Sequence, residues 1–278
     1  ACCGPFGLKP SRGALIEDRM ADGMVDLSVN HAVTLTVRDS AALFAATENP
    51  ESGLPPVGRI LGPDSKRLRI AFAPEPINGA RLDTETRTAI ENTAELCRTL
   101  GHDVIDWTMP VDGTEFTEQF FLLWAAGAAE FAKQAQSLNP DADPATILEP
   151  WTLGLAQEFA ERRGSFESAI AYLKAFEPRY DSFFEDFDVI LTPTLSKLPP
   201  EIGVQAPTRE YGALREEIIN FAAFTAPMNV AGAASMNVPV QWTSSGFPVG
   251  SLFSGRRGDD GKLLALAYEL EEAQPWIS

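Results

Sequence analysis

Histidine and cysteine are both scarce in this chain. Its 278 residues include 2 histidines, His31 and His102, and 3 cysteines. Neither histidine stands near other candidate ligands, so a histidine-rich metal site and a Ser-His-Asp triad within the chain both lack the residues they need. We therefore expect neither a metal nor another cofactor. Cys2, Cys3 and Cys97 are odd in number and lack metal-ligand spacing, which favours small buried side chains in a reducing compartment over a disulfide framework.

Positive charge is also sparse, and long apolar runs are missing. The net charge is −17, from 39 acidic and 22 basic residues. Such a surface repels phosphate backbones and anionic membranes, so nucleic acid is not an expected partner. No apolar run approaches the ~20 residues that span a bilayer, and the N-terminus lacks the basic start and apolar stretch of a secretory signal. The sequence indicates a soluble, cytoplasmic protein without a membrane partner.

A strand-helix-strand pattern near residue 70 indicates the fold class. With 45% apolar residues, the chain can bury a substantial core in one large domain or two small ones. Residues 68–73 read as a short buried strand, and a helical pattern then runs from Asp83, a suitable N-cap, to Gly101, a suitable C-cap. A second strand, 103–107, follows directly. Because such units normally close as right-handed crossovers between parallel strands, we expect an α/β fold.

A second alternation follows later in the chain. A helix is predicted over about 165–186, and Pro178 should kink or divide it. The apolar run 189–191 then reads as a strand that ends in a turn at 192–194. The aromatic side chains of the helical stretch fall largely on one side, which favours core packing over a ligand site. They are Phe176, Tyr180, Phe183, Phe184 and Phe187.

The last part of the chain reads as a hairpin and a helix. Strands are predicted over 236–241 and 249–253, and a terminal helix over 262–273. The proline- and glycine-rich stretches 48–66 and 193–208 read as surface loops, the second of them a candidate for a place near a site.

The first residues resemble mid-chain sequence. They contain no initiator methionine, and the glycines and prolines of Cys3-Gly4-Pro5-Phe6-Gly7-Leu8-Lys9-Pro10-Ser11 indicate buried, tightly turned backbone. The pattern of these residues, extended to Gly13, resembles the stretch of amidase-signature enzymes that directly follows the glycine-glycine-serine loop holding their nucleophile. Later segments resemble the same family in the same order. They are His31–Leu43, Phe187–Thr194, Phe224–Gly232 and Gly246–Gly250.

The resemblance covers nearly the whole chain and implies the C-terminal part of an amidase-signature hydrolase. It implies a mixed, largely parallel β-sheet covered by helices on both faces, with residues 1–278 forming the C-terminal part of a single domain. Among members, the chain looks closest to bacterial amidases of the 6-aminohexanoate cyclic dimer hydrolase type, on the Pro199–Gly203 loop and the Gln274–Trp276 ending.

The chemistry that the resemblance implies is acyl transfer from an amide to a serine, activated by a second serine across a cis peptide bond and by a lysine base. A lysine serves as a base only where burial or neighbouring charge lowers its pKa. This triad and the oxyanion loop belong to the earlier half of the family's chain, so we assign no catalytic residue here. Lys9, Ser11, Ser196 and Ser235 are expected to be structural. The expected partner is the N-terminal half of the same amidase, as a fragment or a separate chain.

By position in the resemblance, two segments are expected to contact a small-molecule amide substrate. Phe120, Leu123 and Trp124 lie on an apolar helix that lines the pocket in relatives, and Thr225 and Asn229 lie on the late loop behind the site. The alternatives are that the helix residues are ordinary core and that Asn229 satisfies loop backbone groups.

Asn237 stands where the family usually has a small hydroxyl residue, which leaves the local hydrogen bonding open. Two functional classes also remain open. The first is an enzyme part that is inactive alone. The second, a non-catalytic subunit or scaffold derived from the amidase fold, is disfavoured because a sheet cut through its middle would expose unpaired edges. A second copy of the chain, forming a homodimer, is a further candidate partner.

Overall fold

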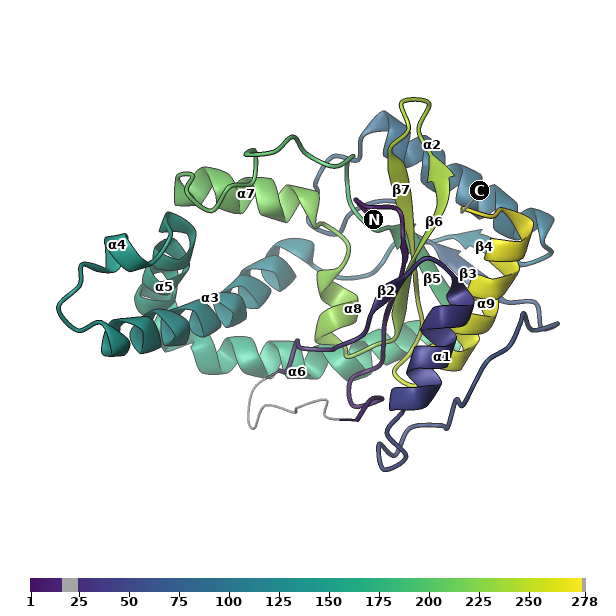
Figure 1. Ribbon diagram of the computed structural model, residues 1–278, viewed down its shortest axis with the longest axis horizontal. Coiled ribbons are helices and arrows are strands. Elements are labelled where there is room, and N and C mark those ends of the chain that lie inside the picture. Colours follow the sequence, from purple (N-terminus) through teal and green to yellow (C-terminus); the bar gives the residue numbers. More distant parts are fainter. Residues whose placement is uncertain (17–24, 277–278) are drawn as a thin grey trace.

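The computed structural model describes residues 1–16 and 25–276, which are arranged around one mixed sheet (Figure 1). The strand order is β2-β1-β6-β7-β5-β3-β4. The strands are β1 (Phe6–Lys9), β2 (Val33–Thr34), β3 (Arg69–Phe72), β4 (Asp103–Asp106), β5 (Val189–Pro193), β6 (Ser235–Trp242) and β7 (Pro248–Ser254). The helices are α1 (Val37–Thr47), α2 (Thr84–Thr99), α3 (Gly113–Leu138), α4 (Pro144–Ile147), α5 (Pro150–Arg162), α6 (Phe166–Ser182), α7 (Tyr211–Phe221), α8 (Ala226–Val230) and α9 (Asp260–Ala273).

The expected mixed α/β sheet is confirmed, but parallel pairing does not predominate. Within the described residues, β3 pairs in parallel with β4 and β5. The neighbours β5 and β7, β7 and β6, β6 and β1, and β1 and β2 are antiparallel. The short connection between β6 and β7 accounts for one of these pairs, since a tight hairpin joins only antiparallel strands.

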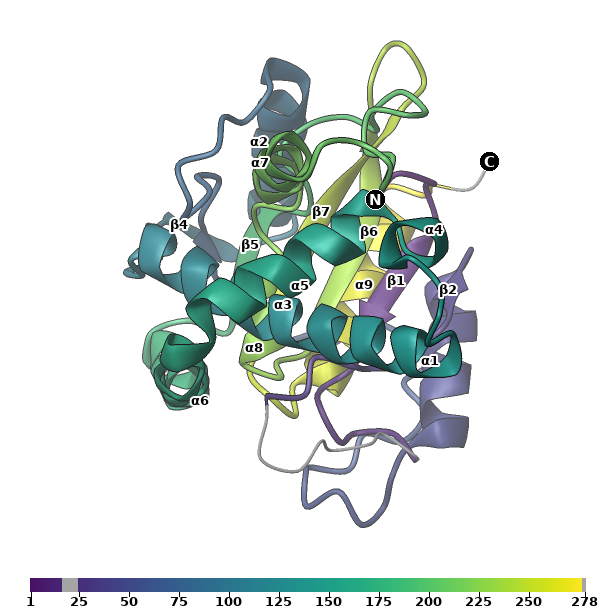
Figure 2. The same ribbon diagram turned by 90° about the vertical axis from the view of Figure 1, so that its left-hand side faces the viewer.

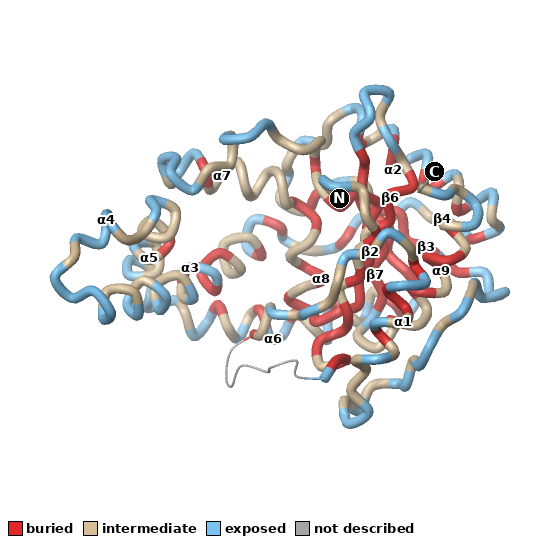
Figure 3. The backbone as a smooth tube through the Cα atoms, viewed as in Figure 1, coloured by how far each residue is buried: buried red, intermediate tan, exposed pale blue. Residues whose placement is uncertain are grey.

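Side chains that alternate along the central strands build two cores, one on each face of the sheet. On β3, Ile70 and Phe72 pack with α1, α2 and α9, whereas Ala71 packs with α3, α6 and α8 on the other face. The buried backbone follows the strands (Figure 3), while α3, α4, α5 and α7 extend away from the sheet as a helical lobe (Figures 1 and 2).

The predicted strand-helix-strand unit is confirmed with its caps. The side chain of Asp83 accepts a hydrogen bond from the backbone N–H of Thr86 at 2.6 Å, which starts α2. Gly101 follows the end of α2 with φ +88°, a conformation that glycine adopts without strain. The predicted hairpin and terminal helix are also present as β6, β7 and α9.

A division of the helix at Pro178, one of the two effects expected there, is contradicted, and so is the turn expected at residues 192–194. Pro178 does not divide its helix, because α6 runs through it from Phe166 to Ser182, held by buried Leu173, Phe176 and Tyr180 on both sides of the proline. The residues Thr192 and Pro193 do not form a turn but continue β5. Pairing with β3 ends at Leu191, so the missing N–H of Pro193 costs no ladder bond on that side, while β7 still pairs with it on the other.

Of the three cysteines that were expected to be buried, only Cys97 is buried. Cys97 is buried in the core beneath α2, and burial raises the pKa of its thiol to about 12. Cys2 and Cys3 are exposed, because they precede β1 and no core covers them.

Among the described helices, none is long and apolar enough to cross a membrane.

His102 links the start of β3 to α9. Its Nδ1 accepts the backbone N–H of Leu68 at 3.1 Å, and its Nε2 lies 3.1 Å from Oε2 of Glu269. An Nδ1 that accepts a hydrogen bond carries no proton, so this geometry requires the neutral imidazole with its proton on Nε2. Burial lowers the pKa of His102, although the neighbouring Glu269 acts in the opposite direction.

We predict that the free energy of unfolding decreases as the pH falls below about 6.5, the ordinary pKa of an unfolded histidine. The free energy of unfolding decreases toward low pH because the pKa of His102 is depressed in the folded protein, so the unfolded chain binds the proton more readily. Urea denaturation between pH 7.5 and 5 should give a shallower pH dependence for His102→Gln than for the parent.

His31 titrates in the same direction, because burial also lowers its pKa. The variant His31→Gln is therefore measured in parallel. If the parent and His102→Gln curves run parallel over this range, His102 does not carry the effect.

Candidate functional site

The first strand of the chain is an inner strand of the sheet. Gly7, Leu8 and Lys9 of β1 pair with β6, while β2 pairs on the other side. Lys9 Nζ donates to the carbonyl of Pro10 at 2.9 Å. The middle of the Cys3–Ser11 segment, Phe6–Lys9, is therefore an inner part of the sheet.

The residues after β1 anchor the start of α9 and the late loop. The backbone N–H of Ser11 donates to Oδ1 of buried Asp260 at 2.8 Å, and the Oγ of Ser11 accepts the N–H of Gly258 at 2.7 Å. Burial raises the pKa of Asp260, and hydrogen bonding from Ser11 opposes that shift. Arg12 Nη2 donates to the carbonyls of Asn229 and Val230, each at 2.9 Å. These contacts tie the two ends of the chain together.

An apolar cleft lies between the helical lobe and α8. We call it the aromatic cleft, and its volume is about 50 Å³. It is lined by Ile77, Asn78, Phe116, Thr117, Phe120, Phe121, Trp124, Ile218, Ile219, Ala222, Ala223, Ala226 and Pro227. None of these side chains is charged. Asn78 is already engaged, since its Nδ2 donates to the Ile219 carbonyl at 2.9 Å and its Oδ1 accepts the N–H of Ala80 at 3.1 Å.

The aromatic side of the cleft is one face of α3. Phe116, Phe120 and Trp124 recur every four residues, which places them above one another on the helix. The ring centroids of Phe120 and Trp124 lie 6.3 Å apart in an edge-on arrangement. Trp124 also stands edge-on to Trp151 of α5 at 5.6 Å and keeps 38% of its surface exposed. An apolar group entering the cleft would therefore meet aromatic rings that are only partly covered.

A second cavity lies on the same face of the sheet, over β1, β6 and β7. This sheet cavity has a volume of about 230 Å³ and is lined by Gly7, Leu8, Lys9, Thr225, Met228, Ser235, Asn237 and Leu252. Ser235 is 4% exposed, and its Oγ has no hydrogen-bond partner among the described residues. The sheet cavity thus combines polar groups with an apolar floor.

The first turn of α8 separates the two cavities. Ala226 and Pro227 line the aromatic cleft, whereas Thr225 and Met228 line the sheet cavity. A ligand that bridges this turn would place an apolar group in the cleft and a polar group over the sheet.

The predicted site residues fall in three places. Phe120 and Trp124 line the aromatic cleft and Thr225 lines the sheet cavity. Leu123 is buried in the core beneath α3 and lines neither cavity. Asn229 is half-buried on α8 and offers its backbone carbonyl to Arg12, also outside both linings. The structure therefore brings together part of the predicted set.

The cleft wall formed by α7 was not predicted. Ile218, Ile219 and Ala222 form an apolar stripe at helical spacing, which is a visible signal in the sequence. That signal does not say which part of the chain the stripe faces, so the wall could be found only in the folded structure.

Asn237, which replaces the small hydroxyl residue usual in the resembled family, forms two side-chain hydrogen bonds. Its Oδ1 accepts from Oγ1 of Thr194 at 2.7 Å, and its Nδ2 donates to the carbonyl of Pro5 at 3.4 Å. This side chain fills the space above Gly250 of β7, where an added Cβ would lie 2.0 Å from Asn237 Oδ1. Asn237 thus joins the lead into β1 to the end of β5, and Gly250 makes room for it.

We predict that Gly250→Ala lowers the free energy of unfolding by about 1–3 kcal/mol, the usual cost of overpacking a tight site. Urea denaturation measures the change. The matched control is Gly62→Ala, where an added Cβ meets nothing within 4 Å. Equal stability of the two variants would contradict the packing seen around Asn237.

In the part of the chain that the structure describes, no group of three or more histidine, cysteine, aspartate or glutamate side chains is placed to hold a metal ion.

The fold is shared with solved amidase structures. "Structure of 6-aminohexanoate cyclic dimer hydrolase" superposes with a TM-score of 0.81 over 99% of this chain and 61% of that chain, at 24% identity. A bacterial aryl acylamidase of the amidase-signature family superposes with a TM-score of 0.79, at 18% identity, over 99% of this chain and 59% of that one. At these identities, the likeness establishes the fold.

The sequence comparisons establish the family. The family model described as Amidase matches residues 1–264. "Putative amidase AmiC" of Mycobacterium leprae (strain TN) is 34% identical over 281 residues, which cover 99% of this chain and 59% of that protein. The chain belongs to the amidase family, and the resemblance read from its motifs is confirmed. The chain spans about three fifths of the length of the relatives that it matches.

Proposed function

We propose that this chain is the C-terminal part of an amide hydrolase whose Ser-Ser-Lys triad lies in the preceding half of the same domain. Membership of the amidase family is the observation that carries the proposal. The chain supplies the sheet core and the walls of the substrate pocket, and its partner is the half that contains the triad.

The surface beside β1 supports such a partner. At the edge strand β2, Val33 of the strand and Leu35 directly after it are 71% and 66% exposed. Large apolar side chains exposed together at a sheet edge are suited to contact with another polypeptide segment.

In the proposed reaction, the serine oxygen attacks the amide carbonyl carbon and loses its proton toward the lysine through the second serine. The carbon-nitrogen bond then breaks as the leaving amine takes up a proton, and water hydrolyses the acyl-enzyme ester. The reacting carbonyl lies over the sheet cavity near Thr225. The uncharged apolar part of the substrate lies between Phe120 and Trp124, with Leu123 supporting α3 from the core and Asn229 holding Arg12.

Hydrolysis and labelling separate this proposal from a non-catalytic scaffold. We expect this 278-residue chain alone to hydrolyse no amide and to resist a fluorophosphonate, which labels activated serines. The same chain combined with an N-terminal amidase half should do both. Intact-mass analysis of every polypeptide in each preparation is the control. Labelling and hydrolysis by the chain alone would contradict the position of the triad, and inactivity of the combined protein toward all amides would favour the scaffold.

We predict that Trp124→Ala raises KM for an amide with an aromatic or long alkyl group by about tenfold, equivalent to about 1.4 kcal/mol. The matched control is Phe131→Ala on the same helix, because Phe131 is 58% exposed and lies outside both cavity linings. Steady-state kinetics on the active protein measures both. Equal KM values for Trp124→Ala and the parent would remove the cleft from the proposed substrate site.

A further inference from the structure

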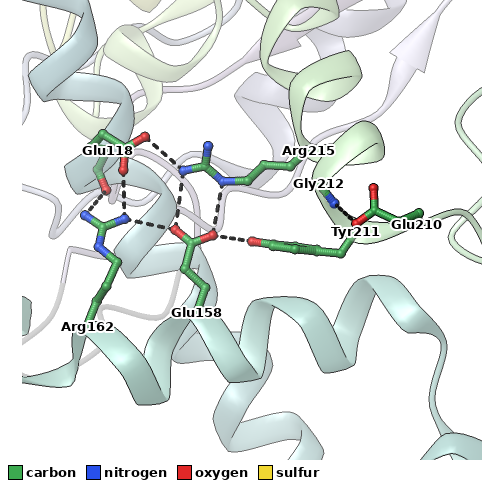
Figure 4. A network of polar contacts seen from close by, with 7 residues as sticks. All are labelled: Glu118, Glu158, Arg162, Glu210, Tyr211, Gly212 and Arg215. Atoms are coloured by element: carbon green, nitrogen blue, oxygen red, sulfur yellow. Dashed lines mark hydrogen bonds and ion pairs between the residues drawn. The ribbon is translucent and has the colours of Figure 1, made fainter.

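Arg215 of α7 lies between carboxylates from two other helices (Figure 4). Its Nη2 is 3.0 Å from Oε1 of Glu118 on α3, and its Nε is 3.1 Å from Oε2 of Glu158 on α5. The guanidinium also lies 4.5 Å from the centre of the Phe121 ring. Glu158 and Arg215 are 12% and 20% exposed, so solvent screens their attraction less than that of a surface pair. One side chain therefore joins three helices.

Glu158 and Arg215 stay ionised. Burial alone would raise the pKa of Glu158, but the hydrogen bond from Tyr211 and the charge of Arg215 outweigh it and hold that pKa below its usual value. Burial alone would lower the pKa of Arg215, but Glu118 and Glu158 outweigh it and raise that pKa. The ion pair between Glu158 and Arg215 is thus intact at neutral pH.

A close steric contact accompanies the ion pairs. The Tyr211 hydroxyl donates to the carboxylate of Glu158, and its ring centroid lies 5.4 Å from that of Trp151. A Cβ added at Gly154 of α5 would lie 2.3 Å from Cγ of Tyr211. The glycine therefore allows α7 to approach α5 more closely than any other residue would permit.

The same helix carries the unpredicted wall of the aromatic cleft. Ile218 and Ile219 follow Arg215 by three and four positions, which places the three side chains on one face of α7, and Ala222 of the cleft lining directly follows the helix. The contacts of Arg215 and Tyr211 fix the position of α7 relative to α3 and α5. They therefore also fix the position of the cleft wall that α7 carries.

We propose that Arg215 is a positioning residue that sets the width of the aromatic cleft and thereby the size of the apolar group that the enzyme accepts. This inference rests on the proposed function, since the cleft must receive part of the substrate. Arg162 offers an internal comparison. It donates to Glu118 at 2.8 Å and to Glu158 at 2.9 Å, and its contacts among the described residues join α3 to α5 without reaching α7.

The first test compares Arg215→Lys with Arg162→Lys in the amide-hydrolysing protein. Lysine keeps the charge but loses the planar fork that reaches two carboxylates. The substrates are primary amides from acetamide to hexanamide, with N-alkyl acetamides as a second series for a group on the amine side. For the longest substrate of the series that the parent prefers, Arg215→Lys should raise KM about tenfold. Acetamide should change less than twofold, and Arg162→Lys should keep the parent's chain-length preference.

The second test uses a steric change that leaves every charge in place. Gly154→Ala pushes Tyr211 and α7 away from α5, so it should reproduce the selectivity change of Arg215→Lys. Its control is Gly127→Ala on α3, where an added Cβ meets nothing within 4 Å. Binding of the neutral dye N-phenyl-1-naphthylamine, measured with Trp124→Ala as the reference for cleft occupancy, should weaken in Arg215→Lys and Gly154→Ala and stay unchanged in both controls.

A uniform loss of kcat across all chain lengths, or the same loss in Arg215→Lys and Arg162→Lys, would show a structural role and overturn the proposal. Unchanged selectivity in Gly154→Ala would overturn it as well. If the parent hydrolyses no amide, the proposed function fails and size selection fails with it. Dye affinity that follows Arg215 and Gly154 but not their controls would in that case still support the positioning of α7.

Discussion

The structure depends on the burial of both faces of the central strands. Every residue of β5 is buried, with Val189 and Leu191 in the core under α1, α2 and α9, and Ile190 in the core under α3, α6 and α8. A strand buried on both faces needs helices on both sides, because side chains alternate between the faces. Of the helices on the second face, α3 and α8 line the aromatic cleft and α8 also lines the sheet cavity, so the packing that stabilises the sheet also positions the candidate site.

The two faces of the sheet have different roles. The face covered by α1, α2 and α9 packs into a continuous apolar core. On the other face, α8 is only five residues long and leaves the sheet cavity beside it, while α3 continues past the sheet into the helical lobe (Figure 1). Function is expected on this second face, because concave apolar surface with a few polar groups is typical of ligand sites.

The helical lobe combines apolar and charged contacts. Phe121 and Leu155 form a small core between α3 and α5, and Arg215 lies over the Phe121 ring from α7. Charged groups this close to an apolar core are stable only when they are paired, and Arg215, Glu118 and Glu158 satisfy one another. Such a network favours one arrangement of the helices over others. Apolar packing alone would specify that arrangement less sharply.

Features that depend on local chemistry and on residue order could be predicted from the amino-acid sequence. The caps Asp83 and Gly101, the hairpin and the terminal helix were readable because each depends on a few neighbouring residues, and the motif order identified the amidase family. Other features depend on contacts between distant parts of the chain. Pro178 remained inside α6 because packing on both sides of it outweighed its local cost. Phe120 faces the cleft while Leu123 faces the core. The sequence could not show this difference, because the opposite wall of the cleft comes from α7, far along the chain. A periodic pattern shows that a helix has an apolar side, and only the folded chain determines what that side meets.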